Sequence, residues 1–320
     1  MAVVGAAGFG GALAAHIVDR HPALELTAAT ARAEAGQRHD SIYPRYGVDR
    51  VLEEFDADAI AERARAALVA YPHKAAAVAV RQLRERGLKV VDLSADFRLG
   101  REAYERWYQP HEAPELLDEA VYGLPEAHRE QIRGADLVAG PGCNSTAAIL
   151  AMLPLAGLIQ DAVVDIKAGM SGTGREPTRE THYVSSADNV NAYRVEGHRH
   201  SAELEQELPP MRLAFVPHLV PVDQGILASC YMTTDGSLDP EQTVERYREA
   251  YAHEPFVDVV DEPPHLAHVR DTNRCRVHVT VVGDRTIAFA AIDNLWKGAA
   301  GQAVQDLNLM LGRPEDEGLS

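Results

Sequence analysis

A cysteine with unusual neighbours is the clearest candidate for chemistry in this sequence. Cys143 follows a Gly-Pro-Gly turn at 140–142 and precedes a polar Asn-Ser-Thr run. An apolar, strand-like segment ends before the turn and a helical segment follows it, so the thiol is expected at a strand-to-helix junction. The N–H groups and positive dipole end of a helix lower the pKa of a thiol and can hold an oxyanion. We therefore predict a nucleophile at Cys143 and interpret Cys230 and Cys275 as small buried apolar residues.

The Gly-His-Arg-His tetrad at 197–200 is a second concentration of reactive side chains. An imidazole titrates near neutral pH and can serve as a general acid or base, while a guanidinium can pair with an anion. The spacing of His198 and His200 is also compatible with metal binding, but no cluster of Cys, Asp or Glu at ligand spacing accompanies it. We expect no metal site. A surface loop with incidental histidines is the alternative interpretation.

Glycines at 5, 8 and 11 form a third motif, GAAGFGG. This spacing lets a backbone turn tightly, approach a pyrophosphate and present helix N–H groups to it. The motif follows an apolar strand and precedes a helix, which is the context of a dinucleotide-binding loop. We assign Gly5, Gly8, Phe9 and Gly11 to cofactor binding, and a purely structural glycine turn is the alternative.

The residues after the second expected strand bear on the choice of cofactor. NAD-selective folds usually place Asp or Glu there, on the ribose hydroxyl, whereas this chain has Thr30 and Arg32. A hydroxyl and a guanidinium suit a 2′-phosphate, so the sequence favours NADPH, with NADP as the oxidised product. The alternative is that Arg32 is a solvated surface residue.

These motifs need strands and helices to position them, and the hydrophobic pattern predicts both in alternation. The expected strands are 2–5, 24–29, 66–71, 88–93 and 136–139, and the expected helices are 12–20, 75–86 and 144–155. Strands that alternate with helices predict an α/β fold with a doubly wound parallel sheet, which here forms a dinucleotide-binding domain.

The pattern changes after the helix that follows Cys143. The expected strands there are 162–167, 212–216, 226–233, 276–282 and 286–292, and the expected helices are 241–252 and an amphipathic 297–311. We predict a mixed, largely antiparallel α+β domain at 143–296 for catalysis and dimerisation. The dinucleotide-binding domain then spans 1–142 and is completed by the C-terminal helix at 297–320.

Composition excludes several classes of protein. The 48 acidic and 31 basic residues give a formal charge of −17, which repels nucleic acid and anionic membrane surfaces. No apolar run approaches the ~20 residues of a membrane span, and the N-terminus lacks the pattern of a secretory signal. Three cysteines are too few for a disulfide framework. We expect a cytoplasmic protein with no nucleic-acid or membrane partner.

Several separated motifs together resemble one enzyme family. They are GAAGFGG at 5–11, VVDLSADFRL at 90–99, WYQPHEAPEL at 107–116, VYGLPE at 121–126, PGCNSTAA at 141–148, GHRH at 197–200, FVPHLVPVDQGIL at 215–227 and AIDNLWKGAAGQAVQ at 291–305. The chain resembles the N-acetyl-gamma-glutamyl-phosphate reductases, within the wider aspartate-semialdehyde dehydrogenase superfamily. The resemblance spans nearly the whole chain.

The resemblance implies an NADPH-dependent reduction of an acyl phosphate to an aldehyde through a cysteine thioester, in arginine biosynthesis. It implies that Cys143 attacks the acyl phosphate and that His198 is the acid/base. It further implies that Tyr193 orients this histidine and that Arg98, of the SADFR motif, holds the phosphate.

The resemblance also extends to a second group of cofactor contacts and to assembly. Ser171, Gly172 and Gly174, in the loop GMSGTGRE, and Asn294 look like contacts on the nicotinamide side, and Lys297 lies in the segment that closes the domain. The family likeness implies a small-molecule acyl-phosphate substrate and a homodimer or homotetramer.

Departures from the family pattern leave the substrate open between two branches. Asn144 and Ser145 follow the cysteine, where the arginine-pathway enzymes usually carry an aromatic residue and a proline. An Asn at this position is similar to a branch that reduces glutamyl or aminoadipyl phosphate on an amino-group carrier protein. The segment MSGTGREPTRETHYV instead resembles the enzymes for the free N-acetylated substrate. The strong negative charge also disfavours an acidic carrier, so we favour N-acetyl-gamma-glutamyl phosphate.

Overall fold

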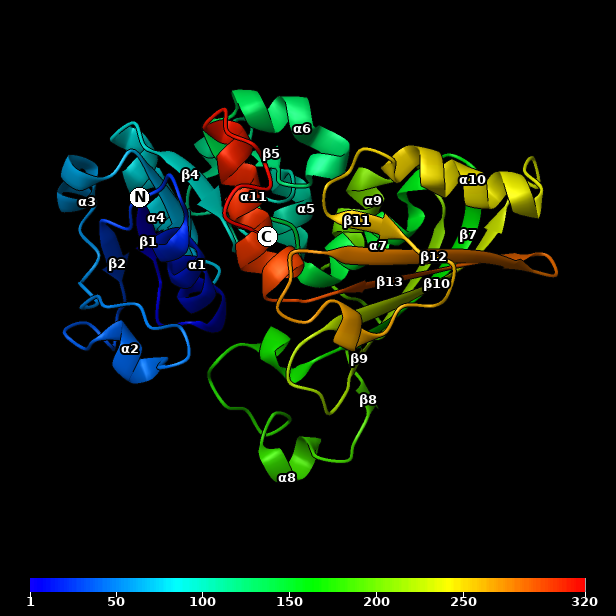
Figure 1. Ribbon diagram of the computed structural model, residues 1–320, viewed down its shortest axis with the longest axis horizontal. Helices are drawn as coiled ribbons and strands as arrows, with labels where there is room; N and C mark the ends of the chain where they lie inside the picture. The colour runs from blue at the N-terminus through cyan, green and yellow to red at the C-terminus, as the bar shows by residue number, and fades with distance from the viewer. Residues whose placement is uncertain (320) are drawn as a thin grey trace. The chain divides into compact units, whose positions relative to one another are not determined.

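The computed structural model (Figure 1) describes residues 1–319 and divides into two compact units. Unit 1 comprises Met1–Pro141 and Ala299–Ser320, and unit 2 comprises Gly142–Gly298. The domain boundaries expected from the sequence were 142/143 and 296/297, whereas the two units meet at 141/142 and 298/299. The chain therefore leaves unit 1 once, builds all of unit 2, and returns to unit 1 for its last segment.

Unit 1 contains a six-stranded sheet in which every pairing is parallel. Its strands are β1 (Ala2–Val4), β2 (Ala28–Thr30), β3 (Ala66–Val69), β4 (Lys89–Asp92), β5 (Val121–Tyr122) and β6 (Leu137–Ala139). They lie in the order β2-β1-β3-β4-β6-β5. Almost every strand residue is buried, as expected when helices cover both faces of a parallel sheet. The predicted doubly wound parallel sheet is confirmed.

The strand order reverses beside β1, because β2 lies on one side of β1 and β3 on the other. Ligands of open α/β sheets bind at such a switch point, beyond the carboxyl ends of the strands. The helices of unit 1 are α1 (Phe9–Arg20), α2 (His39–Ile42), α3 (Ala57–Arg63), α4 (Ala75–Glu85), α5 (Arg101–Trp107), α6 (Pro125–Gly134) and α11 (Gly301–Met310), with the 3-10 turn η1 (Pro114–Leu116). The π-helical turn η5 (Trp296–Ala300) begins in unit 2 and leads into α11. The glycine-rich turn joins β1 to α1 at this switch point.

The C-terminal helix differs from the expected amphipathic helix, because every residue of α11 is buried. Its polar side chains find partners inside unit 1, where Gln302 Nε2 donates to Gly123 O at 2.8 Å and Asn308 Nδ2 donates to Glu317 O at 2.9 Å. The helix packs against α1, α6 and β4. Polar groups are tolerated in a core when they are hydrogen-bonded, so polar residues do not mark a solvent-facing side here.

Unit 2 is built on a seven-stranded mixed sheet. Its strands are β7 (Ile159–Ala168), β8 (Asn191–Ala192), β9 (Arg212–Leu219), β10 (Ile226–Thr234), β11 (Val257–Val259), β12 (Cys275–Val282) and β13 (Arg285–Ile292). They lie in the order β11-β12-β13-β10-β7-β9-β8. The β11–β12 and β7–β9 pairs are parallel and the other four are antiparallel, which confirms the predicted mixed sheet.

One face of this sheet is covered by helices. The helical segments of unit 2 are α7 (Cys143–Met152), η2 (Leu153–Leu155), η3 (Met170–Thr173), α8 (Tyr183–Ser186), α9 (Ser201–Glu207), α10 (Pro240–Tyr251) and η4 (Leu266–His268). α7 packs against β10 and β13, and α10 packs against β12. The hydroxyls of Tyr247 and Tyr251 donate to the carbonyls of Ala151 and Leu150, each at 2.6 Å, which fastens α10 to α7.

The opposite face of the sheet is only partly covered. Lys167 Nζ lies 2.8 Å from Asp165 Oδ2, and His218 Nδ1 lies 3.0 Å from the other oxygen of Asp165, with the three side chains between 26% and 33% exposed. Val163 on the same strand is also partly exposed. The strands therefore alternate between a buried face under the helices and an open face.

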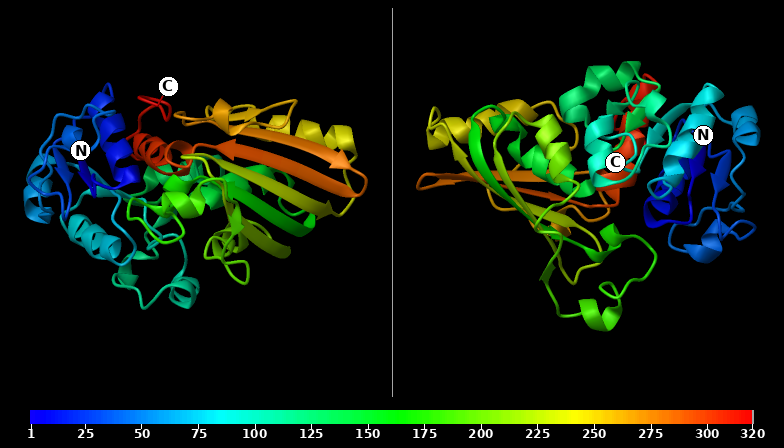
Figure 2. Two further views of the ribbon diagram at one scale, coloured as in Figure 1. Left: turned by 90° about the horizontal axis from the view of Figure 1, so that it is seen from below. Right: turned by 180° about the vertical axis from the view of Figure 1, so that it is seen from behind.

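The loop of unit 2 that carries α8 extends away from this sheet, as Figures 1 and 2 both show. The chain then returns at β8, which pairs with β9 at the edge of the sheet. Tyr183 and Val184 are each 80% exposed at the tip of the loop. The segment connects the loop that holds Gly172 to the loop that holds Tyr193 and His198, so it joins two parts of the candidate site along the chain.

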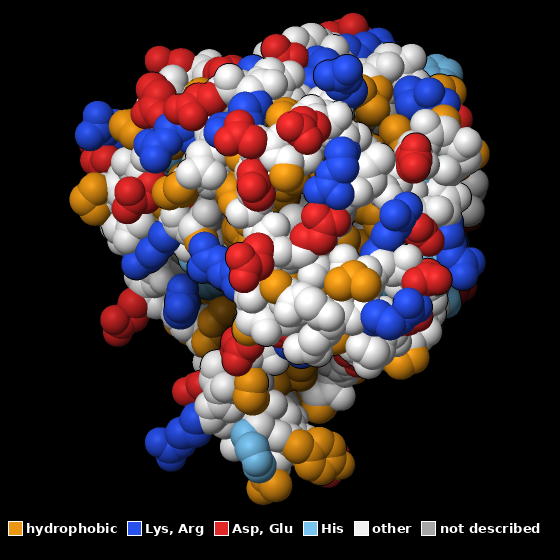
Figure 3. Space-filling view, turned by 90° about the vertical axis from the view of Figure 1, so that its left-hand side faces the viewer, with side chains coloured by type: hydrophobic (Ala, Val, Ile, Leu, Met, Phe, Trp, Pro, Cys, Tyr) orange, Lys and Arg blue, Asp and Glu red, His pale blue; other side chains and the backbone are white. Residues whose placement is uncertain are grey.

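The surface charge is mixed in sign on the face drawn in Figure 3, where acidic and basic side chains are interspersed. The net charge of −17 is therefore not expressed on this face as one continuous acidic patch. Within residues 1–319, no helix has both the length and the apolar character needed to span a membrane.

Candidate active site

The glycine-rich turn of unit 1 places the backbone of the β1–α1 loop directly against β2. The N–H groups of Gly5 and Ala6 both donate to Thr30 O, at 3.0 and 2.8 Å. Gly5 has φ +89°, and a Cβ on Gly11 would lie only 2.1 Å from Gly5 O. Both positions therefore require glycine, and the turn delivers the bare N-terminus of α1 to the end of the sheet, an arrangement suited to a pyrophosphate.

The same turn is braced by an aromatic residue that sequence reasoning did not single out. Tyr43 Oη donates to Ala7 O at 2.8 Å, and the Tyr43 ring meets the Phe9 ring edge-on at a centroid distance of 6.5 Å. Gly8, the N-cap of α1, has no side chain to satisfy the first N–H groups of the helix. Gly8 and Phe9 thus form the start of α1, and their contact with a cofactor stays a prediction.

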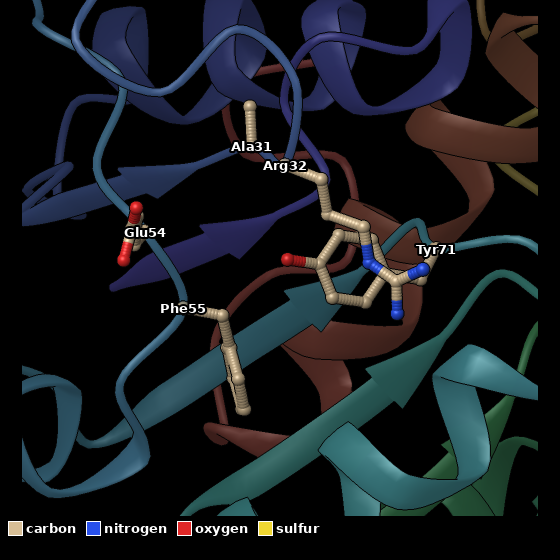
Figure 4. Close-up of a pocket in the computed structure, with 5 residues that line it drawn as sticks. All are labelled: Ala31, Arg32, Glu54, Phe55 and Tyr71. Atoms are coloured by element: carbon tan, nitrogen blue, oxygen red, sulfur yellow. The ribbon is translucent and has the colours of Figure 1, made fainter.

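A pocket next to this turn tests whether a dinucleotide fits (Figure 4). It is lined by Ala31, Arg32, Glu54, Phe55 and Tyr71. The guanidinium of Arg32 lies over the Tyr71 ring, 4.8 Å from its centroid, and the Glu54 carboxylate lies on the other side of the pocket from it. Aromatic rings suit a purine base and the guanidinium suits a phosphate.

Two buried polar atoms strengthen the fit, one on Tyr71, which lines this pocket, and one on Thr30, which directly precedes its first lining residue. Thr30 Oγ1 and Tyr71 Oη are buried and have no hydrogen-bond partner within the part of the chain that the structure describes. Buried hydroxyls normally have partners, and a bound ribose or phosphate would supply them. The hydroxyls of Thr30 and Tyr71, the aromatic rings of the pocket and the N-terminus of α1 together fit a nicotinamide dinucleotide.

The nucleophile candidate occupies the first position of a helix that is otherwise entirely buried. Cys143 is half-buried and begins α7, whose residues 144–152 are all buried. Gly142 precedes it as N-cap in an extended conformation, and the first N–H of the helix backbone to find an intrahelical partner is that of Thr146, which donates to Gly142 O at 2.8 Å. The thiol therefore lies at the positive end of a helix that cannot easily shift.

A buried carboxylate holds the peptide immediately before the nucleophile. Gly142 N donates to Glu203 Oε2 at 2.9 Å, and Glu203 is 1% exposed. His200 Nε2 lies 4.0 Å from the other oxygen of Glu203. A Cβ on Gly142 would lie 2.7 Å from both Glu203 Oε1 and His200 Nε2, and a Cβ on Gly298 would lie 2.8 Å from the Cβ of Cys143. Two glycines thus allow these side chains to close around the cysteine.

Tyr193 approaches the nucleophile through Asn144. Burial raises the pKa of Tyr193, and the negative charge of a Cys143 thiolate raises it further. The Tyr193 hydroxyl is hydrogen-bonded to the Asn144 side chain. Asn144 Oδ1 is itself 4.0 Å from Cys143 Sγ. The structure therefore brings Tyr193 to the thiol across 50 residues of sequence.

His198 is a buried imidazole packed among rings. It stacks on Phe215 at a centroid distance of 5.2 Å and meets the rings of Tyr193 and His200 edge-on at 5.6 and 4.7 Å. Burial, then the positive charge of Arg199 and that of Arg194, lowers the pKa of His198 to about 4. This value lies below the near-neutral titration that the sequence suggests for the tetrad.

The remaining predicted cofactor contacts form a separate cluster in unit 2. Asn294 Nδ2 donates to Ser171 Oγ at 3.0 Å, and Asn294 Oδ1 accepts from Gly225 N at 2.7 Å. Gly172 lies beside them, since its Cβ would be 3.8 Å from Asn294 Nδ2, and Gly174 ends η3 with φ +94°. Asn294 thus ties the 171–174 loop to the loop before β10.

The charged groups of Lys297 and Arg98 contact other groups of the protein. The Lys297 ammonium is buried 5.8 Å from the centroid of the Phe256 ring. Arg98 belongs to unit 1, where its Nε donates to Gly140 O at 2.7 Å and an Nη donates to Leu93 O at 3.0 Å. Arg98 therefore braces the loop that follows β4.

The other two cysteines lack these surroundings. Burial raises the pKa of Cys230 to about 12, and Cys275 is likewise fully buried in the sheet. Within residues 1–319, no group of three or more His, Cys, Asp and Glu side chains is arranged to hold a metal ion.

The structure thus brings Cys143, Tyr193 and His198 together in unit 2, with Ser171, Gly172 and Asn294 in one cluster of the same unit. Glu203 and Tyr43 were missed from the sequence. Glu203 comes three residues after His200, and this spacing puts the two residues on the same side of a short helix. For Tyr43 the sequence offers only a tyrosine within an irregular segment.

Comparisons with protein families match each unit to a separate model. Residues 1–135 match the family described as semialdehyde dehydrogenase, NAD binding domain. Residues 143–294 match the family described as semialdehyde dehydrogenase, dimerisation domain. The second match begins at Cys143.

Curated relatives match over the full chain. A protein from Syntrophobacter fumaroxidans named N-acetyl-gamma-glutamyl-phosphate reductase is 43% identical over 334 residues, which cover 100% of this chain and 97% of the relative. One from Dehalococcoides mccartyi with the same name is 42% identical over 99% of this chain and 96% of its own length.

Solved structures at low identity match the fold. Aspartate semialdehyde dehydrogenase II from Vibrio cholerae, complexed with ASA, superposes with a TM-score of 0.75 at 17% identity, covering 97% of each chain. Aspartate semialdehyde dehydrogenase with NADP from Candida albicans gives a TM-score of 0.75 at 16% identity, again over 97% of each chain.

Proposed function

This chain belongs to the N-acetyl-gamma-glutamyl-phosphate reductase family, and we propose that it reduces N-acetyl-gamma-glutamyl phosphate to N-acetylglutamate semialdehyde and phosphate. The observation that carries the proposal is the position of Cys143, which begins a rigidly buried helix beside Asn144, Tyr193 and the histidine tetrad. The reaction belongs to arginine biosynthesis, as the names of the relatives imply.

The first step forms a thioester on Cys143. The thiolate attacks the acyl carbon, a C–S bond forms, and the C–O bond to phosphate breaks as phosphate leaves with the electron pair. The N–H groups of the first turn of α7 are suited to stabilise the oxyanion of the tetrahedral state. Glu203 keeps the N-cap peptide in place by accepting the Gly142 N–H.

The second step reduces the thioester carbonyl. The nicotinamide cofactor, when bound, supplies a hydride to the carbonyl carbon. The carbonyl oxygen gains negative charge, and we assign the Nε2 end of His198 to hold it. The C–S bond then breaks, the electron pair returns to sulfur, and the aldehyde leaves. Tyr193 positions Asn144 and packs against the edge of His198.

The cofactor assignment follows the two clusters described above. Gly5, Gly8, Phe9 and Gly11 form the site for the pyrophosphate, and Ser171, Gly172, Gly174 and Asn294 form the site for the nicotinamide side. We propose NADPH over NADH because the Arg32 guanidinium lines the pocket after β2, where a positive charge suits a 2′-phosphate. We further propose that Arg98 holds the phosphate of the substrate, as the family resemblance implies.

Assembly and compartment complete the proposal. The open face of the unit 2 sheet is suited to a second copy of the chain, in agreement with the description of the matching family as a dimerisation domain. A homodimer is therefore proposed. A thiol nucleophile and a reduced cofactor require a reducing compartment, which we take to be the cytoplasm.

Thioester trapping tests the reaction directly. The chain, free of cofactor, is mixed with N-acetyl-gamma-glutamyl phosphate, and we expect one equivalent of phosphate release and an acyl adduct on the peptide that contains Cys143. Cys143→Ser should fold and bind NADPH but lose nearly all turnover, because a hydroxyl is far less ionised than a thiol. Cys230→Ala removes a buried thiol and should keep the adduct. Comparable turnover in the serine variant would contradict the thioester mechanism.

The reverse assay tests the substrate. Phosphate-dependent reduction of NADP is measured with N-acetylglutamate semialdehyde, with aspartate semialdehyde and with carrier-linked semialdehydes. The proposal requires the highest kcat/KM with the free N-acetylated substrate. A preference for a carrier-linked substrate would move the chain to the branch that Asn144 resembles.

A further inference from the structure

We propose that His198 acts as a neutral hydrogen-bond donor, fixed with its proton on Nε2 by the backbone N–H of His200, and that it is not the base that ionises Cys143. The inference deepens the proposed function and rests on it for the identity of the carbonyl oxygen. The state of the ring and its relation to the thiol can be measured without substrate.

The tautomer follows from one hydrogen bond. His200 N lies 3.2 Å from His198 Nδ1, with both residues buried. A backbone N–H can only donate, so Nδ1 must accept. A neutral imidazole has one donor and one acceptor nitrogen. The proton of neutral His198 is therefore on Nε2.

The surroundings of the ring also oppose the imidazolium form. Protonation of His198 would place a proton on Nδ1 facing the His200 N–H. Arg199, from the tetrad itself, and Arg194, from the loop after β8, are the charged groups that act on the ring, and both are positive. Tyr193 and His200 present ring edges, and Phe215 of β9 presents an apolar face.

Carboxylates do not reverse this balance. Glu203 on α9 is the buried acid closest in sequence to the tetrad. It accepts the Gly142 N–H and lies 4.0 Å from Nε2 of His200. A catalytic imidazolium is usually stabilised by a carboxylate on its far nitrogen, but the far nitrogen of His198 faces a donor instead. The low pKa of His198, about 4, agrees with this arrangement.

A nitrogen that already carries its proton cannot take one from a thiol. The proton of the Cys143 thiol must then pass to a group other than His198, and the other imidazole of the tetrad, His200, lies beside the Gly142 peptide. The start of α7 favours the resulting thiolate, and His198 is left as a donor. During reduction the carbonyl oxygen accepts the Nε2–H hydrogen bond while its charge grows. When the C–S bond breaks, the oxygen re-forms its double bond and the proton remains on Nε2. The step balances without net proton transfer from His198.

The first test measures the ring itself. Nitrogen NMR of the full chain labelled with ¹⁵N-histidine, without substrate, identifies His198 as the signal missing from His198→Gln. We expect a neutral ring with the proton on Nε2 at pH 7. A neutral ring protonated on Nδ1, or an imidazolium at this pH, overturns the proposal.

The second test compares two amides. Gln places its N–H₂ at about the reach of Nε2 and cannot titrate, whereas Asn is shorter. His198→Gln should keep kcat within about tenfold, while His198→Asn should lose about 10²–10³-fold, as for a lost oxyanion donor. NADPH affinity should stay near wild type in both. Equal losses of about 10²–10⁴-fold in the two variants would indicate acid/base catalysis and overturn the proposal.

The third test asks whether the thiol depends on the imidazole. The rate of Cys143 alkylation by iodoacetamide is followed against pH in wild type and in both variants. We expect the same midpoint in all three, and a midpoint raised by a unit or more in the variants overturns the proposal. A wild-type chain that forms no Cys143 thioester would refute the proposed function while leaving the tautomer and alkylation results intact.

Discussion

A buried carboxyl in unit 1 leads to a prediction about stability and pH. Asp92 ends β4, is fully buried, and accepts Ser94 N and Ser94 Oγ at 3.0 and 2.6 Å. Burial raises the pKa of Asp92 from 3.8 to about 7, with a smaller contribution from the charge of Asp96. The folded chain therefore prefers the neutral acid up to neutrality, whereas the unfolded chain ionises from about pH 4.

The sign and size of the effect follow from this difference. Because the folded pKa is raised, the stabilising contribution is complete below pH 4 and is lost as pH rises through about 7. A shift of about three units at about 1.36 kcal/mol each gives a loss of about 4 kcal/mol. In Asp92→Asn the amide keeps an acceptor for Ser94 N and a donor for Ser94 Oγ, so this loss disappears. We expect the variant to match wild type near pH 4 and to exceed its stability at pH 8.

Urea denaturation at pH 4.5, 6, 7 and 8, followed by circular dichroism, measures the difference in the free energy of unfolding between the two proteins. Other titrating groups cancel in this difference. Asp118→Asn makes the same change at an exposed site of the same unit and is the matched control for replacing a carboxylate by an amide. A difference between Asp92→Asn and wild type that stays constant from pH 4.5 to 8 would refute the reasoning.

Two further predictions concern the cofactor and the nucleophile. Arg32→Ala should weaken NADPH binding about 10–100-fold, the effect of a charged hydrogen bond of about 1.5–3 kcal/mol, and should change NADH binding little; calorimetry that finds equal losses for both would exclude Arg32 as the discriminator. Gly142→Ala would bring a Cβ to 2.7 Å from Glu203 Oε1 and His200 Nε2, so the turn before Cys143 must shift. We expect kcat to fall sharply, while NADPH affinity, measured by fluorescence titration, stays near wild type. An unchanged kcat would contradict the assigned role of Glu203.

The fold was predictable because its signals are local. The apolar run before the first glycines and the helix after them are visible in the first 20 residues, and alternation of this kind specifies a parallel sheet. The same reasoning located Cys143 at the start of a helix, which the structure has at Cys143–Met152. The expected amphipathic helix was wrong at α11, because the polar residues that predicted a solvent-facing side are buried within unit 1. Local periodicity cannot reveal partners that are remote in sequence.

Only part of the candidate site could be predicted from the sequence. The roles of Cys143, His198 and Tyr193 remain predictions. That these three residues lie close together could be anticipated only from the family resemblance. The contact between Gly142 and Glu203 joins residues 61 positions apart, and no spacing rule covers such a distance. The tautomer of His198 depends on the path of the backbone at His200, which composition does not specify.

The discontinuity of unit 1 has a consequence for synthesis on the ribosome. α1, α6 and β4 all pack against α11, which lies after the whole of unit 2 in the chain. A nascent chain that has released residues 1–141 therefore lacks one of the pieces of its first core, and the apolar surfaces that await α11 stay uncovered while residues 142–298 are made. Unit 2 is contiguous and can close before unit 1 does. The first part of this protein to be translated is thus the last to be completed.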